Sequence, residues 1–512
     1  MATAEVEERE LLKAITWYDG FVVAMANPSF LITSLGVSSS ILGGWGAFIL
    51  WTTSVLIGTL HNYIYSETAA MFPKLSGGIA IYAHEAWKRY LSLVGPVAAF
   101  GYWIGWSVVL SATGFITGLL VQAQWYTSSI ETPTHHSAWN HSSSVDVGIG
   151  SIPFYFSFPL AFTVAIIVII WGFNVLGIRP AMWVGYVTGA LLLIPLAVFI
   201  FLPYVTGDWH SSNLHSNIHW TSSVTGDTGI RLVLVWLYIM CWSSYGFECC
   251  ATFAPEYKDT VNDTPKALRT AAIFSALVYA LLPLGAIGTI GDQNLNAGNY
   301  YSFYAQGFDT ILGGGADIAI ILLIAGIILA MNTATADGSR ALYGIAQDDM
   351  TIKQLGKLNR FHVPGNAMTV DAVLNIILLF TFASDAVGAF QILVFSNLGY
   401  VLCHCFAMSG FILLRRDRPE WPRPLRLNGA WVAVAGVLAA YDTLILIVGA
   451  LSPKLSYGVG YKTTVVGLVV LAISVALYFY RVIVQDKKKF QWQLPAATVP
   501  EEEAAIAPVA TV

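Results

Sequence analysis

Long apolar stretches, separated by short polar connections, run along almost the whole chain. A helix needs about 20 apolar residues to cross a bilayer, and twelve stretches reach that scale. Because lipid offers the backbone no hydrogen bonds, each stretch is expected to be a helix. The pattern therefore predicts an all-α integral membrane protein with twelve transmembrane helices. The stretches lie at about 15–36, 43–64, 96–121, 155–176, 181–203, 230–253, 267–290, 316–340, 367–384, 387–413, 430–450 and 462–484.

The first stretch is interrupted near its middle. Over 22–35 it reads VVAMANPSFLITSL, where Pro28 stands between Asn27 and Ser29. Proline donates no backbone hydrogen bond and disfavours helical backbone at the residue before it. We therefore expect the helix to stop at Asn27. Proline in a membrane helix often causes only a kink, so this interruption alone does not identify a site.

The sixth stretch carries a matching interruption. Over 234–250 it reads LVWLYIMCWSSYGFECC, where Ser243, Ser244 and Gly246 break the apolar run and Glu248 follows. Two broken helices five apart are what an inverted five-helix repeat predicts, with the breaks at the substrate site. The freed N–H groups suit a carboxylate and the freed carbonyl groups an ammonium group, so an amino acid fits both.

Composition and charge agree with a membrane protein. Charged residues make up 11% of the 512 residues and hydrophobic residues 56%, whereas soluble domains carry about a quarter charged residues. With an inner N-terminus, the basic residues of the connections fall inside, except Arg231, Lys454 and Lys462. The positive-inside rule then predicts two cytoplasmic tails, at 1–14 and 485–512. The composition of the second predicts disorder.

Cysteine and histidine add little to the function. All five cysteines lie in apolar stretches, so no extracellular disulfide is expected. The outer connections at about 122–154 and 204–229 are rich in histidine, which leaves pH or metal sensing open. Their spacings match no metal motif, and we expect no metal site. The outer histidines are His135, His136, His141, His210, His215 and His219.

Several motifs together point to one family. The segment CWSSYGFECCATFAPEYKDTVNDTPKAL (241–268) resembles the helix-six region of the amino acid–polyamine–organocation (APC) family of permeases and exchangers. YSETAAMFPKLSGGIAIY (65–82) and NVLGIRP (174–180) are similar to its helix-two exit and helix-five entry. SRALYGIAQDDM (339–350) and LLRRDRPEWPRPLRLNGAW (413–431) are similar to its helix-eight exit and the loop after helix ten.

The resemblance implies a LeuT-type fold within one transporter domain, 15–484. Helices one to five (15–203) and six to ten (230–413) would form inverted repeats, followed by helices eleven and twelve (430–484). It places a substrate between the breaks of helices one and six. The substrate-binding residues that it implies are Ala26, Asn27, Pro28, Ser29, Trp242, Ser243, Ser244, Tyr245 and Gly246.

Two residues have more specific implied roles, and two features depart from the family pattern. Trp242 matches the aromatic residue that closes over bound substrate, and Glu248 matches a glutamate implicated in proton response. The first break is Asn-Pro-Ser where the family has Gly-Ser-Gly, so Pro28 removes one backbone donor. Leu192 stands at our estimate of a position where many proton-coupled relatives have lysine, so the sequence resembles the family's exchangers.

Other ionisable residues also lie in or at the edges of the stretches, where unpaired charge is costly. Glu248 is the candidate for proton coupling, with a structural hydrogen-bonding role as the alternative. We expect Asp19, Glu67 and Asp337 to form salt bridges with inner-face arginines such as Arg340. Three further residues, which carry no assignment, are His61, Asp371 and Asp442.

These observations predict a secondary active transporter of amino acids or related amines in the plasma membrane. It would work by alternating access, with proton coupling and exchange both open. The alternatives are a polyamine- or amine-specific exchanger, a nutrient sensor without turnover, and a channel. The chain has no P-loop, HExxH or Gly-x-Ser-x-Gly motif, so no enzyme, cofactor or nucleic-acid partner is expected. The substrate and the oligomeric state stay open.

Overall fold

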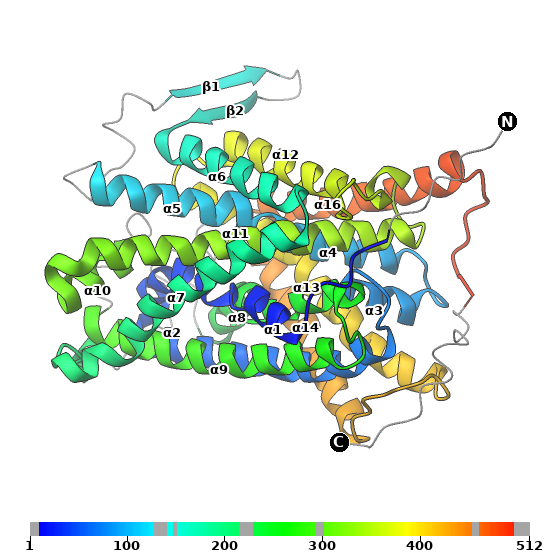
Figure 1. The fold of residues 1–512 in the computed structure, drawn as a ribbon, viewed down its shortest axis with the longest axis horizontal. Coiled ribbons are helices and arrows are strands. Elements are labelled where there is room, and N and C mark those ends of the chain that lie inside the picture. The colour runs from blue at the N-terminus through cyan, green and yellow to red at the C-terminus, as the bar shows by residue number, and fades with distance from the viewer. Residues whose placement is uncertain are drawn as a thin grey trace.

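The computed structural model describes residues 10–126, 141–146, 151–214, 229–291, 302–452 and 460–495. Most of its helices run along one common direction, with the short helices α3 and α10 at opposite ends of the bundle (Figure 1). The α-helices are α1 (Trp17–Ala24), α2 (Asn27–Met71), α3 (Gly78–Trp87), α4 (Val94–Ser107), α5 (Val109–Trp125), α6 (Phe158–Val175), α7 (Ile178–Thr206), α8 (Ile230–Ser244), α9 (Asp263–Ile290), α10 (Phe303–Leu312), α11 (Ala316–Gln347), α12 (Gly365–Phe382), α13 (Ala386–Asp417), α14 (Ala430–Ala450) and α16 (Lys462–Phe479).

Eleven helical segments in the described chain are long and apolar enough to cross a membrane. The first, Trp17–Met71, contains both of the first two predicted stretches. These two parts join at Gly43, where φ is 76° and ψ is 165°. A backbone with this positive φ favours glycine, so Gly43 lets the chain turn between the two parts of α2.

Side-chain burial separates central from peripheral helices. The segment Val94–Trp125, which contains α4 and α5, is buried along its most apolar window. By contrast, α14 and α16 expose apolar side chains such as Val437, Leu444, Val465 and Val469. Exposed apolar rows on a membrane helix suit contact with lipid. The centre of the bundle is therefore the place where polar residues must satisfy one another.

One small sheet departs from the all-α expectation. Strands β1 (His141–Asp146) and β2 (Ser151–Phe156) pair antiparallel, with His141 opposite Phe156. They form a hairpin beside α6 at the edge of the bundle (Figure 1). This hairpin occupies part of the connection at 122–154 that hydropathy assigned to an outer loop.

The start of the predicted C-terminal tail is ordered, which corrects the prediction of disorder from 485 onward. The π-helical segment Tyr480–Gln485 continues α16. The backbone N–H of Ser92 donates to the carbonyl of Trp492 at 2.8 Å, and the N–H of Leu494 donates to the carbonyl of Lys88, also at 2.8 Å. These bonds hold residues up to 495 against the turn between α3 and α4. Composition alone could not show them, because they depend on a partner far away in sequence.

Candidate functional site

The first helix is interrupted at Met25 and Ala26, between α1 and α2. Both residues keep right-handed backbone angles, with ψ of −10° and −28°, so the break is a tight turn. The predicted stop at Asn27 is therefore displaced, because Asn27 begins α2. Pro28 lies in the first turn of α2, where a missing N–H costs no intrahelical bond.

Side chains satisfy the carbonyl groups freed by this turn. The Val23 carbonyl accepts from the Ala26 N–H at 3.3 Å and from the Thr333 hydroxyl at 3.1 Å. The Ala24 carbonyl accepts from the Asn27 side-chain amide at 3.1 Å. Asn27 thus caps α1 with the same side chain that starts α2. The break persists because its neighbours replace the lost hydrogen bonds.

The sixth helix is interrupted where the sequence predicts. Helix α8 ends at Ser244, and after Tyr245 the chain continues as η2, an eleven-residue 3₁₀ segment (Gly246–Glu256). Runs of 3₁₀ helix longer than three or four residues are uncommon and mark strain or a hinge. The Ser244 hydroxyl lies 2.6 Å from the Ser54 hydroxyl of α2, so the end of α8 is tied to the neighbouring helix.

One residue of α9 joins the two breaks. The Tyr279 hydroxyl lies 2.8 Å from the Asn27 carbonyl oxygen and 2.9 Å from the Ser243 carbonyl oxygen. It also lies 2.6 Å from the Ser243 hydroxyl. No pattern in the sequence indicates a role for Tyr279, because a tyrosine within an apolar helix attracts no notice until its partners are known.

The breaks also touch directly at Gly246. A Cβ added at Gly246 would overlap the side-chain oxygen of Asn27, so only glycine fits there. That Asn27 oxygen is buried and has no hydrogen-bond partner in the described chain. Buried polar atoms without a partner are rare and call for an explanation. Asn27 therefore offers an unused acceptor at the contact between the two breaks.

Aromatic side chains cover this contact. The Trp242 ring lies 4.9 Å from the Phe30 ring between centroids, and Phe30 in turn lies 5.6 Å from Trp106. The Trp242 indole N–H donates to the Gly105 carbonyl of α4 at 2.8 Å. Trp242 is only 6% exposed. All nine predicted substrate-binding residues are buried, so the space between the breaks is closed in this conformation.

Two carboxylates lie just beyond the break in helix six. Glu248 accepts from the Tyr400 hydroxyl at 2.6 Å and from the Trp106 indole at 3.3 Å. Asp337 accepts from the Thr252 hydroxyl at 2.6 Å and from the Tyr102 hydroxyl at 3.1 Å. In each carboxylate only one oxygen is bonded, and the other has no partner among the described residues.

The predicted salt bridges are correct for one acid and wrong for another. Glu67 pairs with Arg415 and, at 3.3 Å, with Arg423. Asp337 does not pair with Arg340. Arg340 instead forms a bidentate ion pair with Glu256, in which Arg340 Nη2 lies 3.0 Å from Glu256 Oε2. Both residues of that ion pair are 1% exposed.

Asp19 does not form the predicted salt bridge either. It caps the start of α1 by accepting from the Thr16 backbone N–H at 2.7 Å, and it also accepts from the Tyr186 hydroxyl. Leu192 stands at our estimate of the position where many proton-coupled relatives have lysine. It is fully buried and packs against Gly326 of α11. The Gly326 carbonyl accepts from the Ser29 hydroxyl at 2.7 Å, so Leu192 packs close to the first turn of α2.

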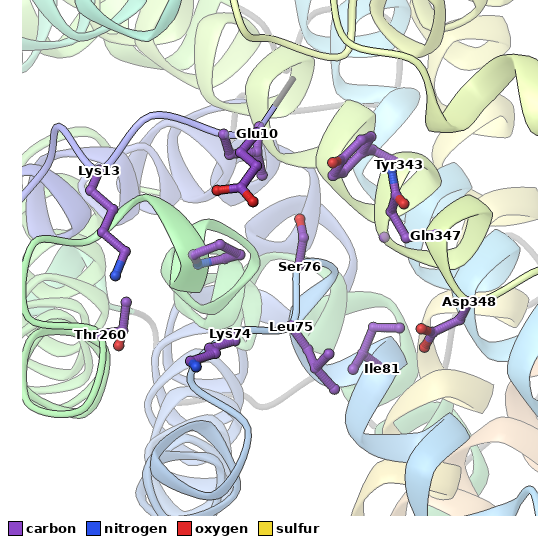
Figure 2. A pocket seen from close by; sticks show the side chains of 13 residues that line it. Glu10, Lys13, Lys74, Leu75, Ser76, Ile81, Thr260, Tyr343, Gln347 and Asp348 are labelled. Carbon is purple, nitrogen blue, oxygen red and sulfur yellow. The ribbon is translucent and has the colours of Figure 1, made fainter. Parts of the chain in front are cut away.

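A pocket of about 460 Å³ opens beside the end of η2. Figure 2 shows Lys13 and Lys74 on one side of it, with Gln347 and Asp348 on the other. Ser76 lies in its middle (Figure 2) and donates to the Thr252 carbonyl at 3.2 Å. Since the Thr252 hydroxyl bonds Asp337, Thr252 connects Ser76 of this pocket to one of the two carboxylates beyond the break.

The outer-loop histidines contribute no site in the described residues. His210 is exposed, and His135, His136, His215 and His219 lie outside those residues. The side chain of His141, at the start of β1, is likewise not described. A close group of possible metal ligands lies instead at the other end of the bundle, where His84, Glu85 and Asp348 meet. Its carboxylate from Glu85 already pairs with Lys88 and Arg418, which opposes a bound cation.

Comparison with known proteins identifies the family. A sequence model described as amino acid permease matches residues 16–477. The chain belongs to the amino acid permease family. Its members are transporters, so this permease is a multi-pass membrane protein that is not an enzyme.

Named relatives span a range of substrates. The permease is 25% identical to a polyamine transporter of Oryza sativa subsp. japonica over 470 residues, covering 89% of this chain and 75% of the relative. It is 22% identical to a branched-chain amino acid permease of Lactococcus lactis subsp. cremoris, covering 71% and 76%. It is also 22% identical to an amino-acid permease of Bacillus subtilis, covering 73% and 70%.

Proposed function

We propose that this permease is a secondary active transporter that carries amino acids or related amines across the plasma membrane by alternating access. The observation that carries this proposal is the contact between the two helix breaks, which Tyr279 joins through the carbonyl groups of Asn27 and Ser243. Interrupted helices that meet inside the bilayer are a recurrent form of transporter substrate site.

The proposed architecture is the LeuT-type arrangement of two inverted five-helix repeats followed by two helices. Treating Trp17–Met71 as two spans that join at Gly43 raises the eleven spans to the twelve that this arrangement needs. The breaks at Met25–Ala26 and at Tyr245 then fall in the first helix of each repeat. Both tails would lie in the cytoplasm.

In the proposed cycle, substrate replaces contacts that the closed site makes with itself. The unused oxygen of Asn27 and the carbonyl groups held by Tyr279 would accept hydrogen bonds from an ammonium group. Trp242 would move away from Phe30 to admit substrate and return to cover it. The pocket at Ser76 would form the inner route, closed in this conformation by contacts that include the Arg340–Glu256 ion pair.

A cationic amine is a second candidate substrate, and a specific observation favours it. Glu248 and Asp337 lie beyond the break, each with a buried oxygen that lacks a partner, and the described ion pairs include neither residue. Unpaired carboxylates inside a membrane protein favour a cationic ligand. The similarity to a polyamine transporter supports the same reading.

Transport in proteoliposomes tests the proposal. The full chain would be supplied with a panel of labelled neutral amino acids, cationic amino acids and polyamines, with and without a pH gradient and internal substrate. Accumulation against a gradient would support secondary transport and exclude both a channel and a sensor. Binding of a panel member without any uptake would overturn the proposal and favour a sensor. Dependence on internal substrate would assign exchange, and dependence on the pH gradient would assign proton coupling.

A further inference from the structure

A second polar cluster lies inside the bundle at the helix-six break. It consists of His61 on α2, Asp442 on α14, His404 on α13 and Tyr245 at the break. Each of these side chains is fully buried. Hydropathy placed His61 and Asp442 in separate membrane stretches and gave no role to either. Their positions in the fold bring them into contact.

The hydrogen-bond distances indicate how many protons the His61–Asp442 pair holds. His61 Nδ1 lies 2.9 Å from the Ile57 carbonyl oxygen, which only accepts, so Nδ1 carries a proton. His61 Nε2 lies 2.7 Å from Asp442 Oδ2. That contact holds one proton, either as imidazolium with carboxylate or as imidazole with carboxylic acid. The pair is therefore neutral as a whole and can gain or lose one proton.

Tyr245 connects this pair to the helix-six break. Its hydroxyl donates to the other Asp442 oxygen, Oδ1, at 3.4 Å. Its ring lies 4.6 Å from the His61 ring between centroids. Tyr245 is the single residue between the α-helical and 3₁₀ parts of the sixth span. The side chain that contacts Asp442 therefore belongs to the residue at which the helix type changes.

The backbone contact on the same side strengthens this connection. A Cβ added at Gly58, one turn before His61, would overlap the carbonyl oxygen of Ser244. The helix that carries His61 therefore packs directly against the end of α8. His61 and Asp442 are buried, so no solvent screens a change in their charge. Low-dielectric surroundings also strengthen each polar contact that such a change affects.

His404 lies between this pair and Glu248. Its Nδ1 lies 2.7 Å from the Tyr65 hydroxyl, while its Nε2 is buried with no partner in the described chain. The His404 ring lies 5.6 Å from that of His61 and 4.7 Å from that of Tyr400, which bonds Glu248. Other titratable groups that face the pair are Cys241, Cys405 and Tyr441.

We propose that the His61–Asp442 pair is a proton-binding site that controls the helix-six break through Tyr245. When a proton from the aqueous phase reaches the imidazolium–carboxylate form of the pair, the pair becomes imidazolium with carboxylic acid. Asp442 then loses its charge and holds Tyr245 less strongly, since charged acceptors form the stronger hydrogen bonds. When the proton leaves, the carboxylate holds Tyr245 again.

Infrared spectroscopy of the full chain in lipid nanodiscs tests proton binding without any substrate. Acidification should add a carboxylic acid band that is absent in Asp442→Asn. Asp371→Asn is the matched control, because Asp371 is another buried carboxylate, bonded to Trp103 at 3.0 Å and outside this cluster. It should keep the band of Asp442 and lose only the band of its own carboxyl group. Identical difference spectra for wild type and Asp442→Asn would overturn the proposal.

A second measurement tests control of the break and does not need Asp442→Asn to fold. Cys249 and Cys250 are buried in η2, so their reaction with a membrane-permeant maleimide reports opening of the break. The wild-type rate divided by the Tyr245→Phe rate at each pH cancels the intrinsic pH dependence of the thiols. We expect Tyr245→Phe to react at least about tenfold faster at high pH, a difference of about 1.4 kcal/mol, and the rates to converge at low pH. A pH-independent ratio would overturn the proposal.

Both outcomes are independent of the proposed transport function, because neither experiment contains an amino acid or amine. A permease that transports nothing on the panel would still show the Asp442 band and the pH-dependent rate ratio. A permease that transports normally but lacks both signals would keep the proposed function and lose this inference. The two proposals therefore fail separately.

Discussion

The hydroxyl group of Tyr279 lies 2.8 Å from the backbone carbonyl oxygen of Asn27, although 252 residues separate the two in sequence. The same hydroxyl reaches Ser243, so one side chain of α9 holds both helix breaks together. A hydroxyl has a single proton to donate, so it cannot satisfy both carbonyl groups fully. The contact between the two helix breaks therefore forms in this conformation, yet it depends on hydrogen bonds that a ligand can replace.

Tyr279→Phe should loosen this junction without changing its shape. Removing the hydroxyl leaves two buried carbonyl groups with a lost partner, at a cost of about 1–3 kcal/mol. We expect a lower thermal unfolding temperature in detergent and weaker binding of whichever panel substrate the wild type transports. Tyr304→Phe is the control, since its buried hydroxyl has no hydrogen-bond partner in the described chain. Equal effects of the two substitutions would show that the Tyr279 hydroxyl does not stabilise the contact between the two breaks.

Trp242→Ala should impair closure of the site over substrate. The substitution removes the ring that packs on Phe30 and the indole bond to Gly105, and truncating a buried tryptophan costs about 3–5 kcal/mol. Trp242→Phe keeps an aromatic ring and should recover part of the activity. Uptake kinetics in proteoliposomes would compare the two variants. If Trp242→Ala kept both the affinity and the turnover of the wild type, the assignment of a gate to Trp242 would be wrong.

Glu248→Gln should abolish any pH dependence that this carboxyl group confers on uptake. A glutamine oxygen can still accept from Tyr400 and Trp106, so the local packing should survive. We expect the variant to lose the part of the wild-type pH dependence of uptake that Glu248 carries, so its profile should differ from that of the wild type. Initial rates over a pH series would measure this. A variant whose pH profile still matched that of the wild type would assign Glu248 a structural role.

Asp348 should make stability fall as pH rises. It lies just outside the membrane span, where burial and then the nearby Glu85 raise its pKa to about 7 from 3.8. Between about pH 4 and 7 the folded state binds a proton that the unfolded state has lost, so stability decreases across that window and stays low above it. Asp348→Asn should remove this dependence and raise the unfolding temperature at pH 8 more than at pH 4.

His84 contributes a slope of opposite sign to that experiment. Burial lowers the pKa of its imidazole from 6.5 to about 4, so between these values the unfolded state binds a proton that the folded state lacks, and this group makes stability rise with pH. The contribution of the carboxyl group is therefore the difference between the slopes of the wild type and Asp348→Asn. Unfolding curves of Asp348→Asn that kept the wild-type slope over this window would contradict the assignment.

Glu256→Gln should destabilise the protein at the end of η2. Glu256 pairs with Arg340 through its side chain, and its backbone carbonyl accepts from the N–H groups of Ala14 and Ile15 at 2.9 and 3.1 Å. Removing one partner of a buried ion pair costs about 3–5 kcal/mol, because the other charge stays buried. Glu420→Gln, at an exposed acid, is the control. Unfolding temperatures of the two variants in detergent would separate them, and equal values would contradict a structural role for the pair.

The sequence by itself determined the membrane spans and the presence of two breaks. A hydrocarbon environment forces every span to be long, apolar and helical, so hydropathy reads these features directly. The break of helix six lies where Ser243, Ser244 and Gly246 predict it. The break of helix one lies earlier than predicted, since local rules treat Pro28 as a stop although it serves equally well in the first turn of a new helix.

Only the tertiary structure decided which polar groups meet. Asp337 contacts Thr252 and Tyr102 where the sequence predicted an arginine, and His61 finds Asp442 at a separation of 381 residues. Each such pairing depends on how helices pack. The sequence of one apolar stretch does not show which face of a neighbouring helix it contacts. Burial inside a bilayer then makes these pairings obligatory, because a polar group there has no water to turn to.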